Sequence, residues 1–318
     1  MRVLFAGSPA IAVPSLETLC REDGVTLAGV LTNPDSPRGR RGTPQPTEVG
    51  EAAETIMKKD GLSFPILKPL KLDSDLRGQV CALKPDLLVS FAYGRFFGPK
   101  FMALFPLGGI NIHPSILPKY RGPTPIQAAI LNRDDVTGIT VQRLSQEMDG
   151  GEILACEYLQ LTGRETAGSL GEIMAVKAAR PLSEVLKNIA AGTICGKEQD
   201  HGSASFCSLI SKEDSIINWK MSAAEIEARV RAFDPWPLCR TIHNGRELLI
   251  LKADLYKGGT VPDKEPGFVL GMDERYGILV QTGDGILAVT ELQYQARKAL
   301  FWRDFLNGAR DFSGSRLG

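Results

Sequence analysis

Asn111 and His113 are separated by one residue near the end of an apolar run. The chain has only three histidines, and this one is followed by the proline-rich stretch PSILPKYRGPTP (114–125). Side chains two positions apart on an extended strand face the same side. An amide can donate hydrogen bonds, and an imidazole exchanges a proton near neutral pH. The pair therefore predicts a site that polarises a carbonyl group and stabilises the oxyanion formed when that carbonyl is attacked.

A carboxylate that could orient the imidazole lies further along, where Asp149 stands in the stretch MDGGEIL (148–154). The two glycines after it let the backbone turn sharply and bring the carboxylate towards another strand end. A histidine beside a proline can equally be a hydrogen-bonded structural residue. On spacing alone, Asn111, His113 and Asp149 support acyl transfer as a hypothesis.

Other site chemistries lack their sequence patterns. The remaining histidines, His201 and His243, have no cysteine or histidine at ligand spacing, so we expect no metal site. The motif G-x-S-x-G of serine hydrolases does not occur. Gly7 follows the first apolar run, but G-x-G-x-x-G is absent, which disfavours a dinucleotide cofactor.

Short apolar runs alternate with helix-length amphipathic segments in the first half of the chain. The runs at 2–7, 25–32, 86–93 and 108–114 have the composition of buried strands, and 13–22, 47–60 and 74–84 have apolar residues at helical spacing. This alternation predicts an α/β fold with a doubly wound, Rossmann-like parallel sheet. Asn111 and His113 would lie at the carboxyl end of a strand, where ligands bind in such sheets.

The second half has a different pattern. Segments 136–145 and 151–161 are expected to form a late strand pair, and a single long helix over 166–192 would close the first domain. We expect the catalytic domain to span 1–190, with a polar linker at 191–207. Short strands with Gly-Asp turns then predict a smaller β-barrel, OB-like domain over 208–318.

Composition narrows the function class. The chain has 318 residues and 43% hydrophobic content, which is typical of a globular protein with a full core. Lys+Arg and Asp+Glu both number 37, so any contact with nucleic acid must be a local patch. The six cysteines are scattered, and no signal peptide or membrane segment is evident, so we expect a soluble, cytoplasmic protein.

One long loop interrupts the strand–helix alternation. Residues 32–50 are proline-rich and carry three clustered arginines: Arg38, Arg40 and Arg41. The loop is either a solvated surface segment or a basic finger that binds phosphate groups.

The block NIHPSILPKYRGPTPIQ (111–127), followed by MDGGEIL, resembles the signature of tetrahydrofolate-dependent formyltransferases. FAGSP, NPDSPRGR, VSFAYG, SLISKEDSIINW and RAFDPWP resemble the members that formylate methionyl-tRNA. The resemblance implies transfer of the formyl group of 10-formyltetrahydrofolate to the α-amine of methionyl-initiator tRNA, for translation initiation. It also implies a C-terminal domain that contacts tRNA, and we expect a monomer.

The resemblance assigns roles to residues. Asn111, His113 and Asp149 would be catalytic, and the three loop arginines would bind tRNA. The folate would be lined, largely by backbone groups, at Phe91, Ala92, Tyr93, Ser115, Ile116, Leu117 and Pro118. Arg121 would either steer the glutamate tail of the folate or pin the loop. The family's usual block differs at Ile116, Tyr120, Pro123 and Thr124, which puts the fine shape of the folate pocket in question.

Other functions share part of this pattern. A formyltransferase acting on an amino-sugar nucleotide would also carry a C-terminal domain, whereas a glycinamide ribonucleotide enzyme would need a shorter chain. A non-catalytic folate-binding or RNA-binding module is the third alternative, and the intact Asn-His-Asp set argues against it.

Overall fold

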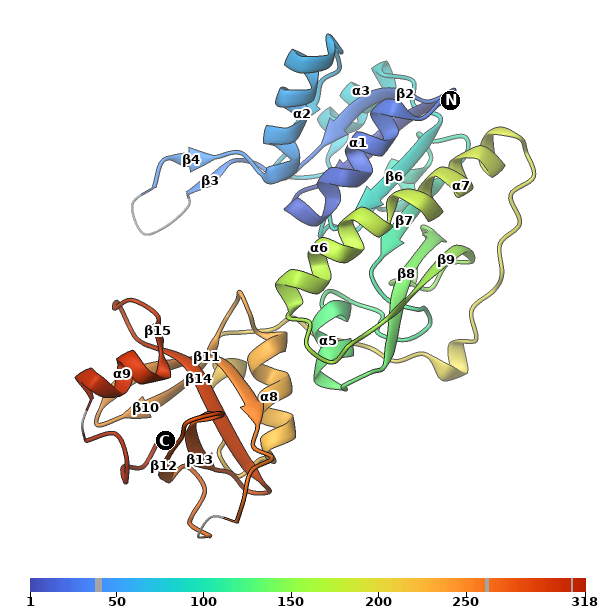
Figure 1. Cartoon of the computed structure of the whole chain (residues 1–318). Coiled ribbons are helices and arrows are strands. Elements are labelled where there is room, and N and C mark those ends of the chain that lie inside the picture. The colour runs from blue at the N-terminus through green and yellow to red at the C-terminus, as the bar shows by residue number, and fades with distance from the viewer. Residues whose placement is uncertain (38–41, 261–262, 310) are drawn as a thin grey trace. The chain divides into compact units, whose positions relative to one another are not determined.

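The computed structural model describes residues 1–37, 42–260, 263–309 and 311–318 (Figure 1). The chain divides into two compact units. The first comprises 1–125, 136–160 and 171–208, and the second comprises 126–135, 161–170 and 209–318. The three predicted tRNA-binding residues, Arg38, Arg40 and Arg41, all lie outside the described residues.

A seven-stranded sheet forms the centre of the first unit, in the order β5-β2-β1-β6-β7-β8-β9. The strands from β5 to β7 are parallel, and β8 and β9 continue the sheet antiparallel. Its strands are β1 (Arg2–Gly7), β2 (Thr26–Leu31), β5 (Ile66–Leu67), β6 (Leu87–Phe91), β7 (Gly109–His113), β8 (Val136–Arg143) and β9 (Ile153–Gln160). The predicted parallel α/β class is confirmed, together with the late strand pair.

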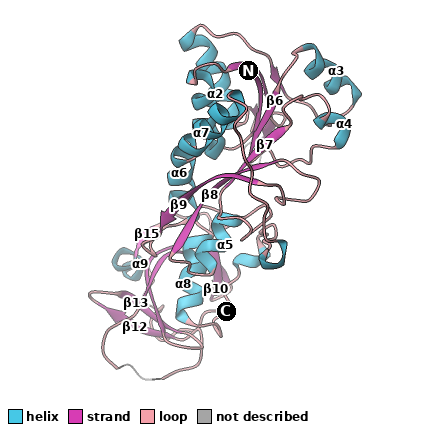
Figure 2. Cartoon of the chain, turned by 90° about the vertical axis from the view of Figure 1, so that its right-hand side faces the viewer, coloured by secondary structure: helices cyan, strands magenta, loops and turns pink. Residues whose placement is uncertain are grey.

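Helices cover both faces of this sheet. Figure 2 shows α2 (Glu48–Asp60) and α7 (Ala179–Ala190) on one face, with α3 (Ser74–Ala82) and α4 (Pro99–Met102) on the other. On the α3 side, Leu4 and Leu88 pack into a core that holds a row of neighbouring aromatic rings. The row consists of Tyr93, Phe97, Phe101 and Phe105, with neighbouring ring centroids 5.4–5.5 Å apart. This core joins β1, β2 and β6 to α3.

Local sequence explains where the helices start and stop. Helix α1 (Val13–Arg21) begins with a proline in its first turn, where a missing N–H costs nothing. Thr47 caps α2 by accepting a hydrogen bond from Gly50 N, and Gly61 ends the helix at φ 65°.

The single helix predicted over 166–192 is wrong in one respect. The structure has two helices, α6 (Ala167–Lys177) and α7, which begins at Ala179. Pro181 stands in the first turn of α7. A proline is tolerated in the first turn of a helix. Inside one continuous helix, its ring would clash with the carbonyl of Lys177, four residues earlier.

The second unit is built on an antiparallel sheet in the order β10-β11-β14-β13-β12, with β15 paired to β14. Its strands are β10 (Cys239–His243), β11 (Arg246–Leu255), β12 (Val269–Asp273), β13 (Gly277–Gln281), β14 (Ile286–Tyr294) and β15 (Leu300–Phe301). The predicted β-rich class is confirmed. The pairing path ends at β10 and β12, so ladder bonds among the described residues do not close it into a full ring.

Several short elements were not predicted from the sequence. They are β3 (Ser36–Pro37), β4 (Pro44–Gln45), α5 (Pro125–Leu131), α8 (Ala223–Ala232), α9 (Trp302–Gly308) and three 3-10 turns at Ala10–Ala12, His201–Ser203 and Glu213–Ser215, together with β5, α4, β10 and β15 described above. Strands β3 and β4 pair antiparallel at the two ends of the arginine-rich segment. In the described part of the chain, no helix has both the length and the apolar composition that a membrane crossing requires.

Candidate active site

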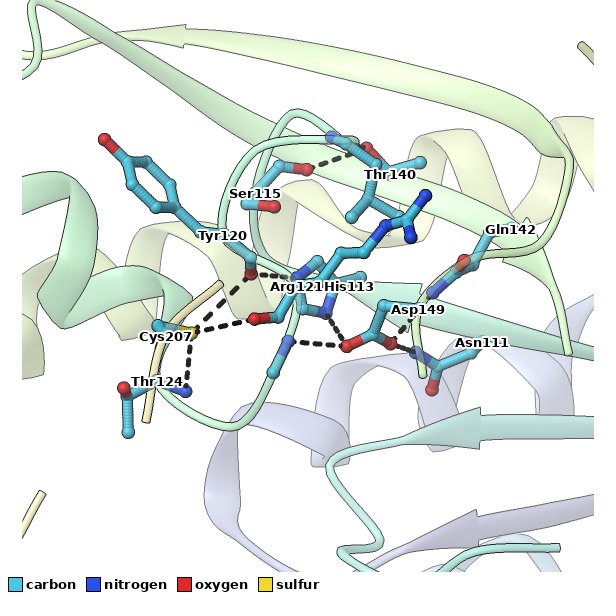
Figure 3. Close-up of polar contacts among 12 residues, drawn as sticks. Asn111, His113, Ser115, Tyr120, Arg121, Thr124, Thr140, Gln142, Asp149 and Cys207 are labelled. Carbon is cyan, nitrogen blue, oxygen red and sulfur yellow. Dashed lines mark hydrogen bonds and ion pairs between the residues drawn. The ribbon is translucent and has the colours of Figure 1, made fainter. Parts of the chain in front are cut away.

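The end of β7 carries the two residues that the sequence singled out. Asn111 pairs with Gln142 and His113 with Thr140 across the antiparallel ladder to β8. Asp149 comes from the turn between β8 and β9, and its carboxylate faces both side chains (Figure 3). Asn111 Nδ2 lies 3.5 Å from Asp149 Oδ1, and His113 Nδ1 lies 3.6 Å from Asp149 Oδ2. The three predicted residues therefore lie together.

Two further donors hold the Asp149 carboxylate. Gln142 Nε2 donates to Oδ1 at 2.9 Å, and the backbone N–H of Gly122 donates to Oδ2 at 2.8 Å. Asp149 itself has φ 51°, a left-handed conformation that aspartate tolerates better than most residues. Gly151 then passes so close to β8 that an added Cβ would stand 1.9 Å from the carbonyl oxygen of Arg143. The glycine therefore permits the tight turn that brings Asp149 to the site.

The position of the ring proton of His113 follows from its partners. Nε2 lies 2.9 Å from the carbonyl oxygen of Tyr120, which can only accept a hydrogen bond. Nε2 must therefore carry the proton, which leaves Nδ1 with a lone pair in the neutral ring. That lone pair is on the side of the ring that Asp149 and Asn111 face (Figure 3). In the neutral ring, Nδ1 is therefore the nitrogen that can accept a proton.

His113 is 4% exposed, and this burial has the largest influence on its pKa. Burial lowers the pKa of the imidazole below its ordinary value, while the Asp149 carboxylate and the hydrogen bond to Tyr120 raise it. The net direction is downward. The ring is thus neutral at physiological pH, and once it is charged it has an oxygen acceptor at each nitrogen.

The segment predicted to line the folate is fixed from below by Thr140. Thr140 Oγ1 donates to the carbonyl of Ser115 at 2.7 Å and accepts from Leu117 N at 3.2 Å. The side chains of Ser115 and Leu117 are buried, whereas Ile116 and Pro118 are half-buried. The carbonyl oxygens of Ile116 and Pro118 also accept hydrogen bonds within the protein, from Lys119 N at 3.0 Å and Ser205 N at 3.2 Å, so their half-buried side chains are the parts that can face a ligand.

The strand end at 91–94 has a similar division. Phe91 and Tyr93 turn their rings into the core, and Ala92 is exposed at φ 50°. The carbonyl of Tyr93 accepts a hydrogen bond from Asn33 Nδ2 at 3.2 Å. At this strand end, the exposed backbone beside Ala92 is what can meet a flat ligand ring.

Arg121 is buried and bound on several sides. Its residue is 1% exposed, Nη1 binds Glu147 Oε1 at 2.6 Å, and Nη2 binds Gln199 Oε1 at 2.8 Å. Nη2 also lies 3.3 Å from His201 Nδ1, and Phe206 lies over the guanidinium. These contacts match the loop-pinning alternative rather than contact with a glutamate tail.

The segment at 191–207 has a larger role than the sequence indicated. Its backbone bonds to the site loop through Arg121 N to Ser205 O (2.8 Å) and Cys207 N to Arg121 O (2.9 Å). Gly122 needs this proximity, because an added Cβ would stand 2.4 Å from Cys207 O. The only sequence signal was a polar, glycine-containing composition, which is also typical of a free linker.

The described part of the chain holds no group of three or more metal-ligating side chains.

Comparison with known proteins agrees with this geometry. Residues 1–186 match the formyl transferase family model, and 209–310 match the model of the formyl transferase C-terminal domain. The chain belongs to the formyl transferase family. Among curated relatives of this formyl transferase is a methionyl-tRNA formyltransferase from Treponema denticola, 48% identical over 98% of both chains. Another, from Treponema pallidum, is 42% identical over 100% of this chain and 99% of its own.

Solved structures share the fold of this formyl transferase at lower identity. An N-formyltransferase from Helicobacter canadensis, in complex with folinic acid and dTDP-3-aminofucose, superposes with a TM-score of 0.63 and 22% identity, covering 90% of this chain and 98% of its own. HypX from Aquifex aeolicus with tetrahydrofolic acid gives a TM-score of 0.59 and 18% identity, covering 96% of this chain and 47% of its own. At these identities the likeness establishes the fold.

Proposed function

We propose that the chain transfers the formyl group of 10-formyltetrahydrofolate to the α-amine of methionyl-initiator tRNA, giving N-formylmethionyl-tRNA for translation initiation. The convergence of Asn111, His113 and Asp149 at the end of β7 carries the chemistry. The choice of acceptor rests on relatives 42–48% identical over nearly the whole chain, both named methionyl-tRNA formyltransferase.

The reaction follows from the state of the site. The lone pair of the substrate amine forms a bond to the formyl carbon, and the carbonyl electrons move to oxygen. Asn111 has a second amide hydrogen beside the one that faces Asp149, and it donates to this oxyanion.

The proton then moves through the histidine. One ammonium proton passes to Nδ1 of His113, and Asp149 and the Tyr120 carbonyl stabilise the resulting imidazolium. An electron pair of the oxyanion then re-forms the carbonyl, and the bond between the formyl carbon and the folate nitrogen breaks with its electron pair staying on that nitrogen. The nitrogen takes the proton from Nδ1 of His113, so tetrahydrofolate leaves and the base is restored.

The donor substrate fits the strand ends beside this pair. A flat heterocycle needs exposed backbone and a rigid apolar edge. The exposed turn at Ala92 supplies the first, and Ile116 with Pro118, held by Thr140, supplies the second. We place Phe91, Tyr93, Ser115 and Leu117 behind this surface as its support.

The tRNA side of the proposal rests on sequence. Arg38, Arg40 and Arg41 offer three guanidiniums to acceptor-stem phosphates, which a chain with a net charge of zero must attract locally. We further propose that the catalytic domain spans 1–190, that 208–318 forms a tRNA-contacting domain, and that the enzyme is a cytoplasmic monomer.

An amino-sugar nucleotide is the second candidate acceptor, because one structure of the same fold holds an amino sugar. Formyl transfer measured with methionyl-tRNA and with dTDP-linked amino sugars, side by side, separates the two. We expect product only with methionyl-tRNA. Product with the sugar alone would replace the acceptor, and no product with either would remove the enzymatic proposal.

A further inference from the structure

The segment at 191–207, called the connector below, contacts both of the loops that hold the Asp149 carboxylate. Ser205 and Cys207 bond to the backbone of Arg121, next to the Gly122 N–H that donates to Asp149. Gln199 reaches the second loop with its side chain. The connector therefore bonds to both of these loops, to one through its backbone and to the other through a side chain.

Gln199 uses its whole amide group in this position. Nε2 donates to the carbonyl oxygens of Asp149 at 2.8 Å and Gly151 at 2.7 Å. Oε1 accepts from Arg121 Nε at 3.2 Å and Nη2 at 2.8 Å. The residue is 5% exposed, so these bonds are shielded from water.

The Asp149 turn, which Gln199 holds, has a backbone conformation that needs support from its surroundings. Asp149 has a left-handed conformation at φ 51°. This conformation costs free energy, which contacts with the surroundings must offset. Two hydrogen bonds to carbonyl oxygens on either side of Gly150 fix both ends of that turn. Gln142 completes the set by donating directly to Asp149 Oδ1, and its own Oε1 lies 3.4 Å from Gln199 Nε2.

We propose that Gln199 is a positioning residue for formyl transfer, which holds the Asp149 turn so that the carboxylate faces His113 and Asn111. It does not touch the reacting atoms in this account. The inference rests on the proposed function, since Asp149 matters only if His113 handles a proton. It makes the connector part of the catalytic site.

Two substitutions separate the two halves of the Gln199 amide. Gln199→Met keeps the length but removes every hydrogen bond of the side chain. Gln199→Glu keeps an acceptor for Arg121 and removes both donors, so an acceptor faces the carbonyls of Asp149 and Gly151. The exposed neighbour supplies the matched control, Glu198→Gln.

Steady-state kinetics with 10-formyltetrahydrofolate and methionyl-tRNA, alongside thermal unfolding, provide the test. Both Gln199 variants should lose about 10- to 100-fold in kcat, because small misplacement of a reacting group costs that much. KM for either substrate should change by less than about threefold, since neither substrate contacts Gln199. Glu198→Gln should match the wild type.

Three results would overturn the inference. Wild-type kcat in Gln199→Glu would show that only the Arg121 anchor matters. A loss confined to KM would make Gln199 a binding residue, and unfolding of both variants would make it a stability residue. An inactive wild-type enzyme in the same assay would instead count against the proposed function, so the two failures are distinguishable.

Discussion

Two buried histidines, one in each unit, differ in the partners of their ring nitrogens. His113 is 4% exposed and His243 is 2% exposed, and burial lowers the pKa of both. His113 has an oxygen partner at each ring nitrogen. His243 binds the Tyr294 hydroxyl through Nδ1, packs edge-on against Phe312, and has a buried Nε2 without a partner among the described residues.

The difference lies in what happens when a proton arrives. A charged His113 donates to Tyr120 and faces a carboxylate, so much of its desolvation cost is offset. A charged His243 would leave one N–H without an acceptor in an aromatic cluster. Burial therefore does not identify a catalytic histidine, whereas the partners of its two nitrogens do.

The largest expected effect comes from removing the reactive ring. His113→Ala should lower kcat/KM by about a thousandfold or more, equivalent to roughly 4 kcal/mol, because both the proton acceptor and its charge are lost. His243→Phe, a ring of similar size, should keep activity within about threefold. Steady-state formyl transfer measures both. Equal losses in the two variants would erase the distinction.

The partner of His113 should be nearly as important. Asp149→Asn should lower kcat by about 100-fold, because an amide cannot stabilise the imidazolium. The carboxylate raises the pKa of His113, so its loss lets that pKa fall further. The acidic limb of the kcat/KM profile should thus move to lower pH. An unchanged limb would mean that His113 is not the group that titrates.

A variant in the arginine-rich segment tests whether tRNA binding is separate from the chemistry. Arg40→Ala should raise the KM for methionyl-tRNA by about tenfold and reduce the log–log salt dependence by about one unit, as one phosphate contact is lost. The affinity for folate should not change. Lys58→Ala, on helix α2, offers a matched loss of one charge. Equal effects of the two would make Arg40 an ordinary surface residue.

The smallest effect concerns acid stability of the second unit. The pKa of His243 is lower in the folded protein than in the unfolded chain, mainly because the ring is buried. The unfolded state then binds the extra proton first, so stability is complete above the unfolded pKa and falls as pH drops through it towards the folded pKa. His243→Phe should remove this part of the loss, so the Tm of the variant should fall less than that of the wild type as pH drops. Parallel Tm–pH curves for variant and wild type would refute it.

Much of the first unit could be predicted because its signals are local. Apolar runs and helical periodicity located β1, β2, β6 and β7, and the parallel order placed Asn111 and His113 at a strand end. Gly150 and Gly151 indicated the turn at Asp149. Each of these depends on side-chain type within a few residues.

The rest of the site depends on contacts between distant segments, which leave no local pattern. The Tyr120 carbonyl that fixes the tautomer of His113 is a backbone group and could belong to any residue. Gln199 lies in a polar stretch whose composition is that of a free linker, and its partners are 48 or more positions away. Pro181 is a local signal for the helix break, but the helical periodicity on both sides of it suggested one continuous helix.

The protonation state of His113 tests the central claim most directly. Long-range ¹⁵N–¹H correlation spectra of the ¹⁵N-histidine-labelled enzyme, assigned with His113→Gln and His243→Gln, report the tautomer and titration of each ring. At neutral pH we expect a neutral His113 with its proton on Nε2 and an unprotonated Nδ1 facing Asp149. A proton on Nδ1, or a ring already charged at that pH, would contradict the assignment of Nδ1 as the base.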